Sequence, residues 1–456
     1  MRRYSSGRYW MIKVAKFGGS SLADEIQFQK VKQIVESEAE RKFVVVSACG
    51  KANEEEHKVT DLLYLCAAHL HYGVSAESLF VPIEEKYRRI KERLGLKIDL
   101  DREFEEIRSH FDKEIDTDYL VSRGEYLTAK LLAEYLDAQF VDAKDFIRFI
   151  HNDEVDLEKS REKFFKLIDT DKKIVIPGFY GTLPNGNIKV MSRGGSDITG
   201  AIIANLVDAD VYENWTDVSG IYVADPRIIR NSLSCKRLTY RELRGMSYMG
   251  ANVLHDDAIF PVREKNIPIN IRNTNKPNHP GTMIMNDCSE LDAKDPPRII
   301  TGITGKQGYT VITVVKNHSS TLVGFLRELL SIFEEYRVSI ESVPITVDTF
   351  SIIVSSKAVS NNLYEILNRI KQTFQPDDMR VDENVALVAV VGRRMQSLPG
   401  ISGSLLSEFG RNAINIKVIN QSADELSIVV GVENSDFEKA INCIYERFVL
   451  AQEETL

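Results

Sequence analysis

The last third of the chain repeats itself without a gap, which restricts it to two copies of one small fold. Residues 314–354 match residues 390–430 at a constant offset of 76 positions. Each copy follows the pattern strand, glycine-initiated helix, strand, strand, helix, strand, which predicts a βαββαβ module. A module of about 75 residues has a small core, so two copies would bury more apolar surface by packing against each other. The matched pairs include Val314 and Val390, Gly324 and Gly400, Leu329 and Leu405, Phe333 and Phe409, and Ser351 and Ser427.

The first 300 residues instead alternate short β-rich runs with amphipathic helical patterns. Alternation of this kind predicts an α/β fold, an αβα sandwich around a mainly parallel sheet. One helix is expected directly after Ser21, because Ser21 and Asp24 have the spacing of a capping box. Strands are expected at 12–17, 43–47, 174–176 and 267–271, and helices over most of 54–118, 127–136 and 198–206.

Prolines and glycines between residues 277 and 297 predict a domain boundary. We therefore expect an α/β domain over 11–298 and two βαββαβ domains over 299–381 and 382–456. The last residues of the chain are available to complete the first of these two small domains.

Composition excludes several classes of function. The 456 residues carry a formal net charge of −9, which disfavours a nucleic-acid or membrane-surface binder. No apolar run approaches the roughly 18 residues of a membrane helix. The five cysteines form no C-x-x-C pair, so we expect no metal cage or disulfide framework and a reducing, cytoplasmic location. The basic first ten residues lack an apolar stretch and resemble a leader or arm rather than a signal peptide.

The segment Lys16-Phe17-Gly18-Gly19-Ser20-Ser21 lies between an expected strand and an expected helix. Glycines let backbone N–H groups approach an anion, and a helix N-terminus and Lys16 add positive charge. The segment is neither a Walker A loop nor a dinucleotide fingerprint. It indicates a phosphate site, with a plain β–α turn as the alternative.

A second glycine-rich turn, Ser192-Arg193-Gly194-Gly195-Ser196-Asp197, also precedes an expected helix. The guanidinium of Arg193 can bind a carboxylate through two hydrogen bonds. The alternative is a capped helix, with Ser196 or Asp197 as the cap. The Arg-Gly-Gly run favours an anion site.

Two further segments allow both a structural and a functional interpretation. Ser122 and Glu125 have the spacing of a capping box, and the functional alternative is a carboxylate that holds a substrate ammonium. The stretch from Trp215 to Arg227 combines hydroxyl, carboxylate, aromatic and guanidinium groups. That mixture suits a nucleotide, and a polar turn after a strand is the alternative.

Six segments in order resemble the aspartokinases of the amino-acid kinase superfamily, and the repeat resembles that family's paired ACT domains. The segments are KFGGSS, VVVSACGK, SRGE, SRGGSD, WTDVSGIYVADPR and NIPINIRNTNKPNHPGT. The resemblance spans residue 12 to the C-terminus. It implies ATP-dependent phosphorylation of the aspartate side chain to 4-phospho-L-aspartate, with Mg²⁺, in lysine, threonine and methionine biosynthesis.

The resemblance also implies residue roles. Lys16, Arg193 and Asp197 would be catalytic, with Asp197 organising the pocket. Aspartate would contact Ser47, Thr60, Glu125 and Arg193, with Glu125 at its α-ammonium. ATP would contact Lys16, Gly18, Gly19, Ser20, Thr216, Asp217, Tyr222, Arg227 and Asn252.

One position departs from the family pattern. Where such enzymes usually carry a lysine in a Gly-Ala-Lys-Val-Leu-His-Pro run, this chain has Asn252, and Asp256 replaces the proline. Asn252 lacks the charge that helps hold nucleotide phosphate. One phosphate contact is therefore in doubt, while Lys16 and Arg193 remain.

The ACT-like pair implies feedback control by an amino acid, lysine first and threonine second. The effector segment would include Gly324, Phe325, Leu326, Ser339 and Glu341, where Glu341 replaces a more usual aspartate. The alternative for Glu341 is a surface acid after a strand. The resemblance further implies a homodimer formed through the ACT domains, with a tetramer as the alternative.

Competing interpretations remain at this point. A glutamate or acetylglutamate kinase is disfavoured by SRGGSD and WTDVSGIY, and the second also by the ACT-like repeat. A catalytically dead amino-acid sensor is favoured only by Asn252. A bifunctional aspartokinase–homoserine dehydrogenase is disfavoured because no dinucleotide motif is present.

Overall fold

A computed structural model of the chain describes residues 11–150, 154–192, 194–250, 254, 259–317, 324–421 and 423–451. It divides into two compact units. The first contains residues up to 221 with 234–240 and 252–289, and the second contains 222–233, 241–251 and 290–456. Each is described by itself.

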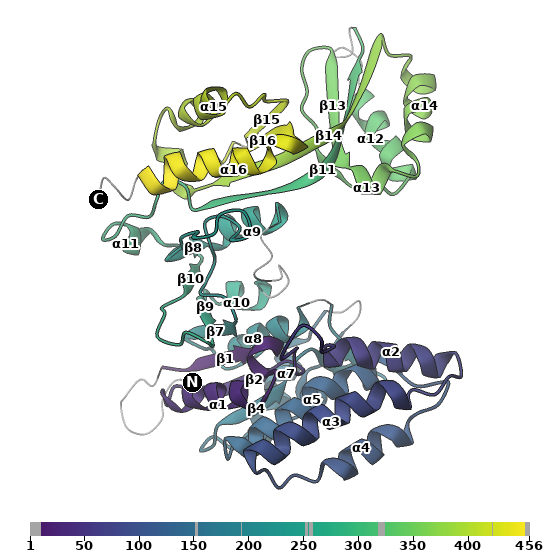
Figure 1. Cartoon of the computed structure of the whole chain (residues 1–456), viewed down its shortest axis with the longest axis vertical. Helices are drawn as coiled ribbons and strands as arrows, with labels where there is room; N and C mark the ends of the chain where they lie inside the picture. Colours follow the sequence, from purple (N-terminus) through teal and green to yellow (C-terminus); the bar gives the residue numbers. More distant parts are fainter. Residues whose placement is uncertain are drawn as a thin grey trace. The chain divides into compact units, whose positions relative to one another are not determined.

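The first unit is built on an eight-stranded, mainly parallel sheet with the order β3-β4-β2-β1-β7-β9-β10-β8 (Figure 1). Neighbours from β3 to β9 are parallel, and only the β9–β10 pair is antiparallel. The strands are β1 (Lys13–Phe17), β2 (Arg41–Val46), β3 (Gln139–Phe140), β4 (Ile174–Pro177), β7 (Val211–Thr216), β8 (Arg237–Thr239), β9 (Ile269–Asn273) and β10 (Thr282–Met285), and β5 (Tyr180–Thr182) and β6 (Ile188–Val190) form a separate hairpin. The predicted α/β sandwich with a parallel sheet is confirmed.

Helices cover both faces of this sheet because alternate strand residues point to opposite sides. On one face Phe17, Val44 and Trp215 share a core with α1 to α5. On the other face lie α7, whose Phe164 packs 5.9 Å from Phe43, and α8. The helices are α1 (Glu25–Glu36), α2 (Val59–His71), α3 (Glu77–Leu94), α4 (Leu100–Ser109), α5 (Thr117–Tyr135), α6 (Ala143–Phe146), α7 (Leu157–Leu167), α8 (Gly195–Leu206) and α10 (Phe260–Glu264), with a 3₁₀ turn η1 (Gly19–Leu22).

The capping box predicted for Ser21 and Asp24 is wrong. Asp24 is itself the N-cap of α1 and accepts a hydrogen bond from the Gln27 amide at 2.9 Å. Ser21 lies one turn earlier, buried in η1, and its hydroxyl pairs with that of Thr274 at 2.7 Å. The helix therefore begins three residues later than the spacing suggested, since the chain first makes a 3₁₀ turn at the glycines.

The second unit contains one continuous six-stranded antiparallel sheet with the order β12-β13-β11-β14-β16-β15. Its strands are β11 (Gly302–Val315), β12 (Ile340–Ser342), β13 (Thr349–Ser355), β14 (Asp378–Val391), β15 (Val418–Gln421) and β16 (Ser427–Glu433). Its helices are α9 (Tyr240–Tyr248, which begins in the first unit), α11 (Ser289–Asp292), α12 (Phe325–Glu335), α13 (Ser356–Val359), α14 (Leu363–Phe374), α15 (Ile401–Arg411) and α16 (Phe437–Tyr445), with short turns η4 (Arg393–Ser397), η5 (Asn434–Asp436) and η6 (Glu446–Leu450).

The internal repeat appears as two matching halves of that sheet. Gly324 and Gly400 occupy the same place, the N-cap of a helix, with φ of 89° and 90°. Glycine adopts this left-handed conformation without the steric cost that a Cβ imposes. The predicted boundary at 381/382 falls within β14, which pairs with β11 in one half and with β11 and β16 in the other.

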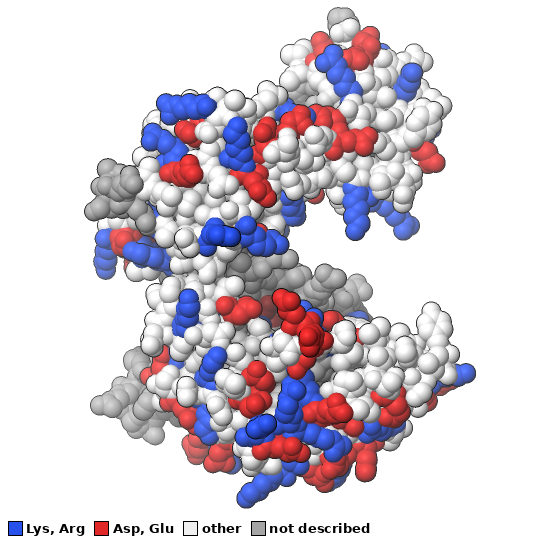
Figure 2. All heavy atoms as spheres, viewed as in Figure 1, with Lys and Arg blue, Asp and Glu red and all other residues white. Residues whose placement is uncertain are grey.

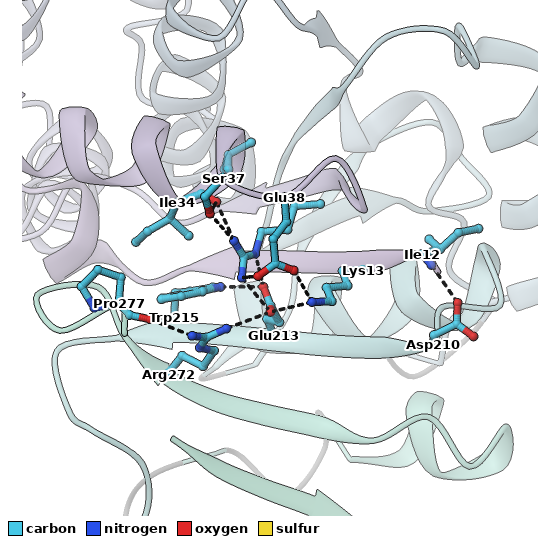
Figure 3. A network of polar contacts seen from close by, with 12 residues as sticks. Ile12, Lys13, Ile34, Ser37, Glu38, Asp210, Glu213, Trp215, Arg272 and Pro277 are labelled. Carbon is cyan, nitrogen blue, oxygen red and sulfur yellow. Dashed lines mark hydrogen bonds and ion pairs between the residues drawn. The ribbon is translucent and has the colours of Figure 1, made fainter. Parts of the chain in front are cut away.

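Buried charges join β1, β2, β7 and β9 in the first unit (Figure 3). The guanidinium of Arg41 donates to both carboxylate oxygens of Glu213, at 2.6 and 3.1 Å, and to Ser37 and the carbonyl of Ile34. Trp215 donates to Glu213 at 3.0 Å, and the Arg272 guanidinium lies 4.5 Å from the Trp215 ring centre. Trp215 therefore belongs to the core and not to a nucleotide-binding loop.

We expect Arg41→Met to destabilise the first unit by about 3 kcal/mol, because removing one partner leaves a buried carboxylate short of a counter-charge. Denaturant unfolding would measure the loss. Arg88→Met is the matched control, since Arg88 pairs with Asp101 on the surface and such pairs contribute about 0–1 kcal/mol. Equal losses in the two variants would contradict the assigned role of Arg41.

No helix among the described residues is long and apolar enough to cross a membrane. All five cysteines are buried, and no disulfide joins any two of them. Acidic and basic side chains are interspersed over the described parts of the face drawn in Figure 2.

Candidate active site

The first glycine-rich corner follows β1 and touches the end of β2. The Gly18 amide donates to the carbonyl of Trp215 at 3.0 Å, and the Gly50 amide donates to that of Gly19 at 2.9 Å. A Cβ built on Gly50 would lie 2.5 Å from the Gly19 carbonyl carbon. The two backbones therefore meet at a distance that only glycine permits, and the corner keeps its amides near Lys16.

Lys16 and the second corner meet directly. The Lys16 side chain emerges on the α8 face of β1 and is only 9% exposed. Its Nζ lies 2.5 Å from Oδ1 of Asp197, in the first turn of α8. The two glycine-rich corners that the sequence singled out thus converge on one ion pair.

Asp197 is held in place by a residue that the sequence analysis missed. Asn214 of β7 is buried and donates from Nδ2 to Asp197 Oδ1 at 2.9 Å. The one sequence feature that could have revealed Asn214 is that it is a polar residue within a buried strand. The N-cap of α8 is Gly194, with φ of 81° and no side-chain cap, so the predicted cap by Ser196 or Asp197 is wrong. Arg193 lies outside the described residues.

Glu125 does not cap a helix. Helix α5 begins at Thr117 with Asp116 as its N-cap, so Ser122 and Glu125 lie inside it. The Ser122 hydroxyl donates to the Tyr119 carbonyl at 2.6 Å instead of reaching a helix terminus. The capping interpretation is therefore wrong, and the Glu125 carboxyl is not used in a helix cap.

The Glu125 carboxyl is buried and incompletely satisfied. The residue is 4% exposed, and Oε2 has no hydrogen-bond partner among the described residues. Burial raises the pKa of Glu125 to about 8, although the Ala48 amide and the charges of Lys16 and Arg123 oppose the rise. An unsatisfied buried acid is costly, and a cationic ligand group would offset that cost.

Helix α5 packs tightly against the corner that follows β2. A Cβ built on Gly124 would lie 2.8 Å from the Ala48 Cβ. The Tyr87 hydroxyl donates to the Gly124 carbonyl at 2.7 Å and fixes the helix there. Ser47, which follows β2, donates its amide to the Phe17 carbonyl at 3.1 Å. Glu125 and Ser47 are therefore set beside the first corner.

Other residues predicted to bind substrate lie near these elements in the chain. Thr60 is partly exposed in the first turn of α2, and Ser20 is exposed in η1. Their assignments to aspartate and to ATP stay predictions.

The turn after β7 is braced by β9. Asn273 donates from Nδ2 to the Asp217 carbonyl at 3.0 Å and to the Ser219 hydroxyl at 2.9 Å. The Thr216 hydroxyl donates to the Asp217 carboxylate at 3.1 Å. Asn273 is another residue that the sequence analysis missed. Its only signal was its place in the NIRNTNKP segment.

The remaining residues predicted to bind ATP fall elsewhere. Tyr222 and Arg227 belong to the second unit. Arg227 has an 88% exposed side chain and pairs with Asp225 at 2.5 Å. Asn252 lies outside the described residues, so the consequence of its missing charge stays a prediction.

The predicted effector segment borders an open groove of 870 Å³ in the second unit. Leu326 and Ser339 line it, together with Glu334 and Arg337. Phe325 instead lies in the core, 4.7 and 4.5 Å from the rings of Phe350 and Phe374. Gly324 caps α12. Glu341 lies in β12, and its carboxylate faces the Tyr248 hydroxyl. Burial, and secondly this carboxylate, raise the pKa of Tyr248 to about 12.

Comparison with known proteins matches both parts of the chain. The amino acid kinase family matches residues 11–273, and an ACT domain matches residues 388–448. Aspartokinase 3 of Bacillus subtilis (strain 168) is 36% identical over 455 residues, covering 96% of this chain and 98% of that protein. The chain is 28% identical to the bifunctional aspartokinase/homoserine dehydrogenase 1 of Arabidopsis thaliana but spans 51% of its length.

Solved structures agree with this match. The crystal structure of Clostridium acetobutylicum aspartate kinase has a TM-score of 0.88 and 44% sequence identity, covering 96% of this chain and 100% of that one. E. coli aspartokinase III in complex with aspartate and ADP shares the fold at a TM-score of 0.73 and 24% identity, over 95% of this chain and 99% of that one. With its first unit matched by the amino acid kinase family and a Bacillus aspartokinase aligned almost end to end, the chain belongs to the aspartokinase family and is an aspartate kinase.

Proposed function

We propose that this aspartate kinase transfers the γ-phosphoryl group of ATP to the side-chain carboxylate of L-aspartate and releases 4-phospho-L-aspartate. The reaction would open lysine, threonine and methionine biosynthesis. The observation that supports it most strongly is the 2.5 Å contact between Lys16 and Asp197. That contact brings Lys16, which directly precedes the first glycine-rich corner, to the first turn of α8, where positive charge can bind anions.

The nucleophile needs no general base, because an aspartate side chain has a pKa of about 3.9 and is ionised at pH 7. The barrier comes from bringing a carboxylate to a polyanionic phosphate. Lys16 and the Gly19 amide would neutralise the charge that develops on the transferring group. The Gly18 amide is not available for this role, because it donates to the Trp215 carbonyl. We expect direct transfer without a phosphoenzyme.

The substrate aspartate would be oriented by groups around Glu125. The free Oε2 of Glu125 would accept a hydrogen bond from the α-ammonium, and Ser47 and Thr60 would contact the remaining polar atoms. Arg193 would bind a carboxylate. Asp197, held by Asn214, would keep Lys16 directed toward the transferring phosphoryl group.

ATP would bind beside the turn that follows β7, through Thr216 and Asp217, with Ser20 at the phosphates. The assignments of Tyr222, Arg227 and Asn252 to ATP stay predictions from the sequence. Mg²⁺, bound together with ATP, would supply positive charge that offsets part of the phosphate charge. No group of three Asp, Glu, His or Cys side chains converges among the described residues. Mg²⁺ usually keeps several waters and is held by one or two carboxylates together with substrate phosphates, so its binding would not require such a group.

An ATP-dependent aspartyl hydroxamate assay tests this function. Hydroxylamine traps an acyl phosphate as a hydroxamate, which is detected by its colour. The colour should appear only when enzyme, ATP, Mg²⁺ and L-aspartate are present together. Colour with L-glutamate but not with L-aspartate would instead identify a glutamate kinase. No colour with either substrate, together with binding of an amino acid, would identify a catalytically dead sensor.

We also propose feedback control by lysine, with threonine as the second candidate, through the groove at α12 and β12. Glu334 and Arg337 supply opposite charges at this groove, which suit the carboxylate and ammonium groups of a free amino acid. The E. coli aspartokinase III has been crystallised with lysine and aspartate. The protein would act in the cytoplasm as a homodimer joined through its ACT domains, or as a tetramer.

We expect millimolar lysine to lower the aspartate kinase rate. In the double variant Arg337→Ala/Glu334→Ala, the lysine concentration needed for half-maximal inhibition should rise at least about tenfold. Inhibition curves with wild-type and the double variant measure the shift. Arg369→Ala is the control, since Arg369 pairs with Glu335 away from the groove lining. Unchanged activity at millimolar lysine and threonine would refute this form of regulation.

A further inference from the structure

A buried lysine fastens the loop between Ser47 and Thr60. Within residues 51–58 of that loop, every residue is exposed except Glu56. Lys86 of α3 is only 7% exposed, and its Nζ donates to Glu56 Oε2 at 2.6 Å and to the Gly50 carbonyl at 2.7 Å. Lysine is almost never buried unless it is paired. Both of these partners belong to the loop between Ser47 and Thr60.

The Glu56 carboxylate has two further partners. It accepts a hydrogen bond from the Ala52 amide at 3.0 Å and one from Arg89 at 3.0 Å. Partial burial by itself would raise the pKa of Glu56, but Lys86, the Ala52 amide and Arg89 together lower it to about 2. The carboxylate therefore stays ionised throughout the neutral pH range, and the pair with Lys86 persists there.

Gly50 connects this pair to the phosphate corner. Its carbonyl is bound by Lys86 and its amide donates to the Gly19 carbonyl at 2.9 Å. The carbonyl of Gly50 is thus fixed toward α3, and its amide is fixed toward the first glycine-rich corner. Gly50 and Gly19 are too close for any Cβ, so a shift of Gly50 would be transmitted to Gly19.

We propose that Lys86 and Glu56 are positioning residues of the phosphoryl-transfer site, which fix Gly50 against Gly19 and hold the 51–58 loop in place. This inference rests on the proposed function, because that function assigns Ser47 and Thr60, on either side of the loop, to aspartate. Neither Lys86 nor Glu56 would touch the reacting atoms. A displacement of about 1 Å at a positioning element can cost on the order of 10²-fold in rate.

The kinetic test compares Lys86→Met with a matched control. Lys130→Met removes a lysine that is less deeply buried than Lys86 but also ion-paired, its partner being Glu103 of α4 in the same helical layer. We expect Lys86→Met to lower kcat/KM for aspartate at least about tenfold, with Lys130→Met within about twofold of wild type. Comparable melting temperatures in the two variants would exclude general destabilisation as the cause.

Two further variants separate the roles of the pair. Glu56→Gln keeps the Lys86 bond to Gly50 and frees the loop, so we expect KM for aspartate to rise and kcat to stay within about twofold. Lys86→Arg keeps the charge and should recover part of the activity lost in Lys86→Met. Identical kinetics for Lys86→Met and Lys130→Met would overturn the proposal.

A readout without catalysis distinguishes failure of this inference from failure of the proposed function. Lys51 and Lys58 are exposed in the loop. Trypsin should cleave the native chain there on the order of tenfold faster in Lys86→Met and Glu56→Gln than in wild type or Lys130→Met, because local opening governs such cleavage. Equal cleavage rates in all four proteins would overturn the proposal even if the wild-type enzyme is an active kinase. Faster cleavage would support it even if the hydroxamate assay failed.

Discussion

Replacing Lys16 with methionine should lower kcat by about 10²- to 10³-fold, because the variant loses a charge aimed at the developing negative charge of the transition state. The protein should remain folded. Among the described residues Lys16 pairs with Asp197, and Asn214 still binds that carboxylate after the substitution. Steady-state kinetics at saturating ATP and aspartate measure the effect, with circular dichroism to verify the fold.

Lys13→Met is the matched control for this prediction. Lys13 stands on the same strand three residues earlier, so its side chain points to the opposite face of the sheet and pairs with Glu38 and Glu213 (Figure 3). We expect its kcat to stay within about twofold of wild type, since it lies outside the proposed site. Wild-type turnover in Lys16→Met would refute the catalytic role of Lys16.

Replacing Glu125 with glutamine should stabilise the free enzyme at alkaline pH and abolish tight aspartate binding. The pKa of Glu125 is about 8 when folded against an ordinary 4.5, so between these values the folded state holds a proton that the unfolded state has lost. The contribution of this carboxyl to stability is therefore complete below pH 4.5 and is lost as pH rises through about 8. The loss is on the order of 4–5 kcal/mol, and neutral glutamine avoids it.

Denaturant unfolding at pH 5, 7 and 9 measures this effect. The stability difference between Glu125→Gln and wild type should grow with pH in favour of the variant. Glu103→Gln is the control, because Glu103 pairs with Lys130 in the same helical layer and its variant should show no such growth. A difference that is independent of pH would contradict a buried, protonated Glu125.

The same carboxyl should link aspartate binding to proton release. A substrate ammonium at Glu125 favours the ionised form and lowers its pKa, so close to one proton should leave as aspartate binds near pH 7. Calorimetry in two buffers of different ionisation enthalpy counts the protons. Glu125→Gln should bind aspartate weakly and release none.

The sequence predicted much of the architecture because its signals were local. The ungapped repeat requires two equivalent helix starts, and Gly324 and Gly400 adopt the same positive φ. Strands and helices follow the apolar periodicity in both parts of the chain. The two incorrect capping boxes have one cause: spacing identifies a possible cap, but only the neighbouring backbone decides where α1 and α5 begin.

The candidate site was predictable only in part. Its glycine-rich corners were visible, and the family resemblance assigned catalytic roles to Lys16 in one corner and to Arg193 and Asp197 in the other. The supporting residues were not visible, because their roles depend on distant contacts. Lys86 lies in the charged run Glu-Lys-Tyr-Arg-Arg and looks like a solvated helix lysine, yet it reaches Gly50, 36 positions earlier. Asn214 likewise acquires its role only when α8 brings Asp197 beside β7.

A structure of the enzyme with L-aspartate and a non-hydrolysable ATP analogue tests the central claim most directly. The measured quantity is the distance from Lys16 Nζ to the nearest γ-phosphate oxygen. We expect it to fall within hydrogen-bonding reach, about 2.7–3.2 Å, with the aspartate ammonium at Glu125. A γ-phosphate bound away from Lys16 and the Gly18–Gly19 corner would contradict phosphoryl transfer at this site.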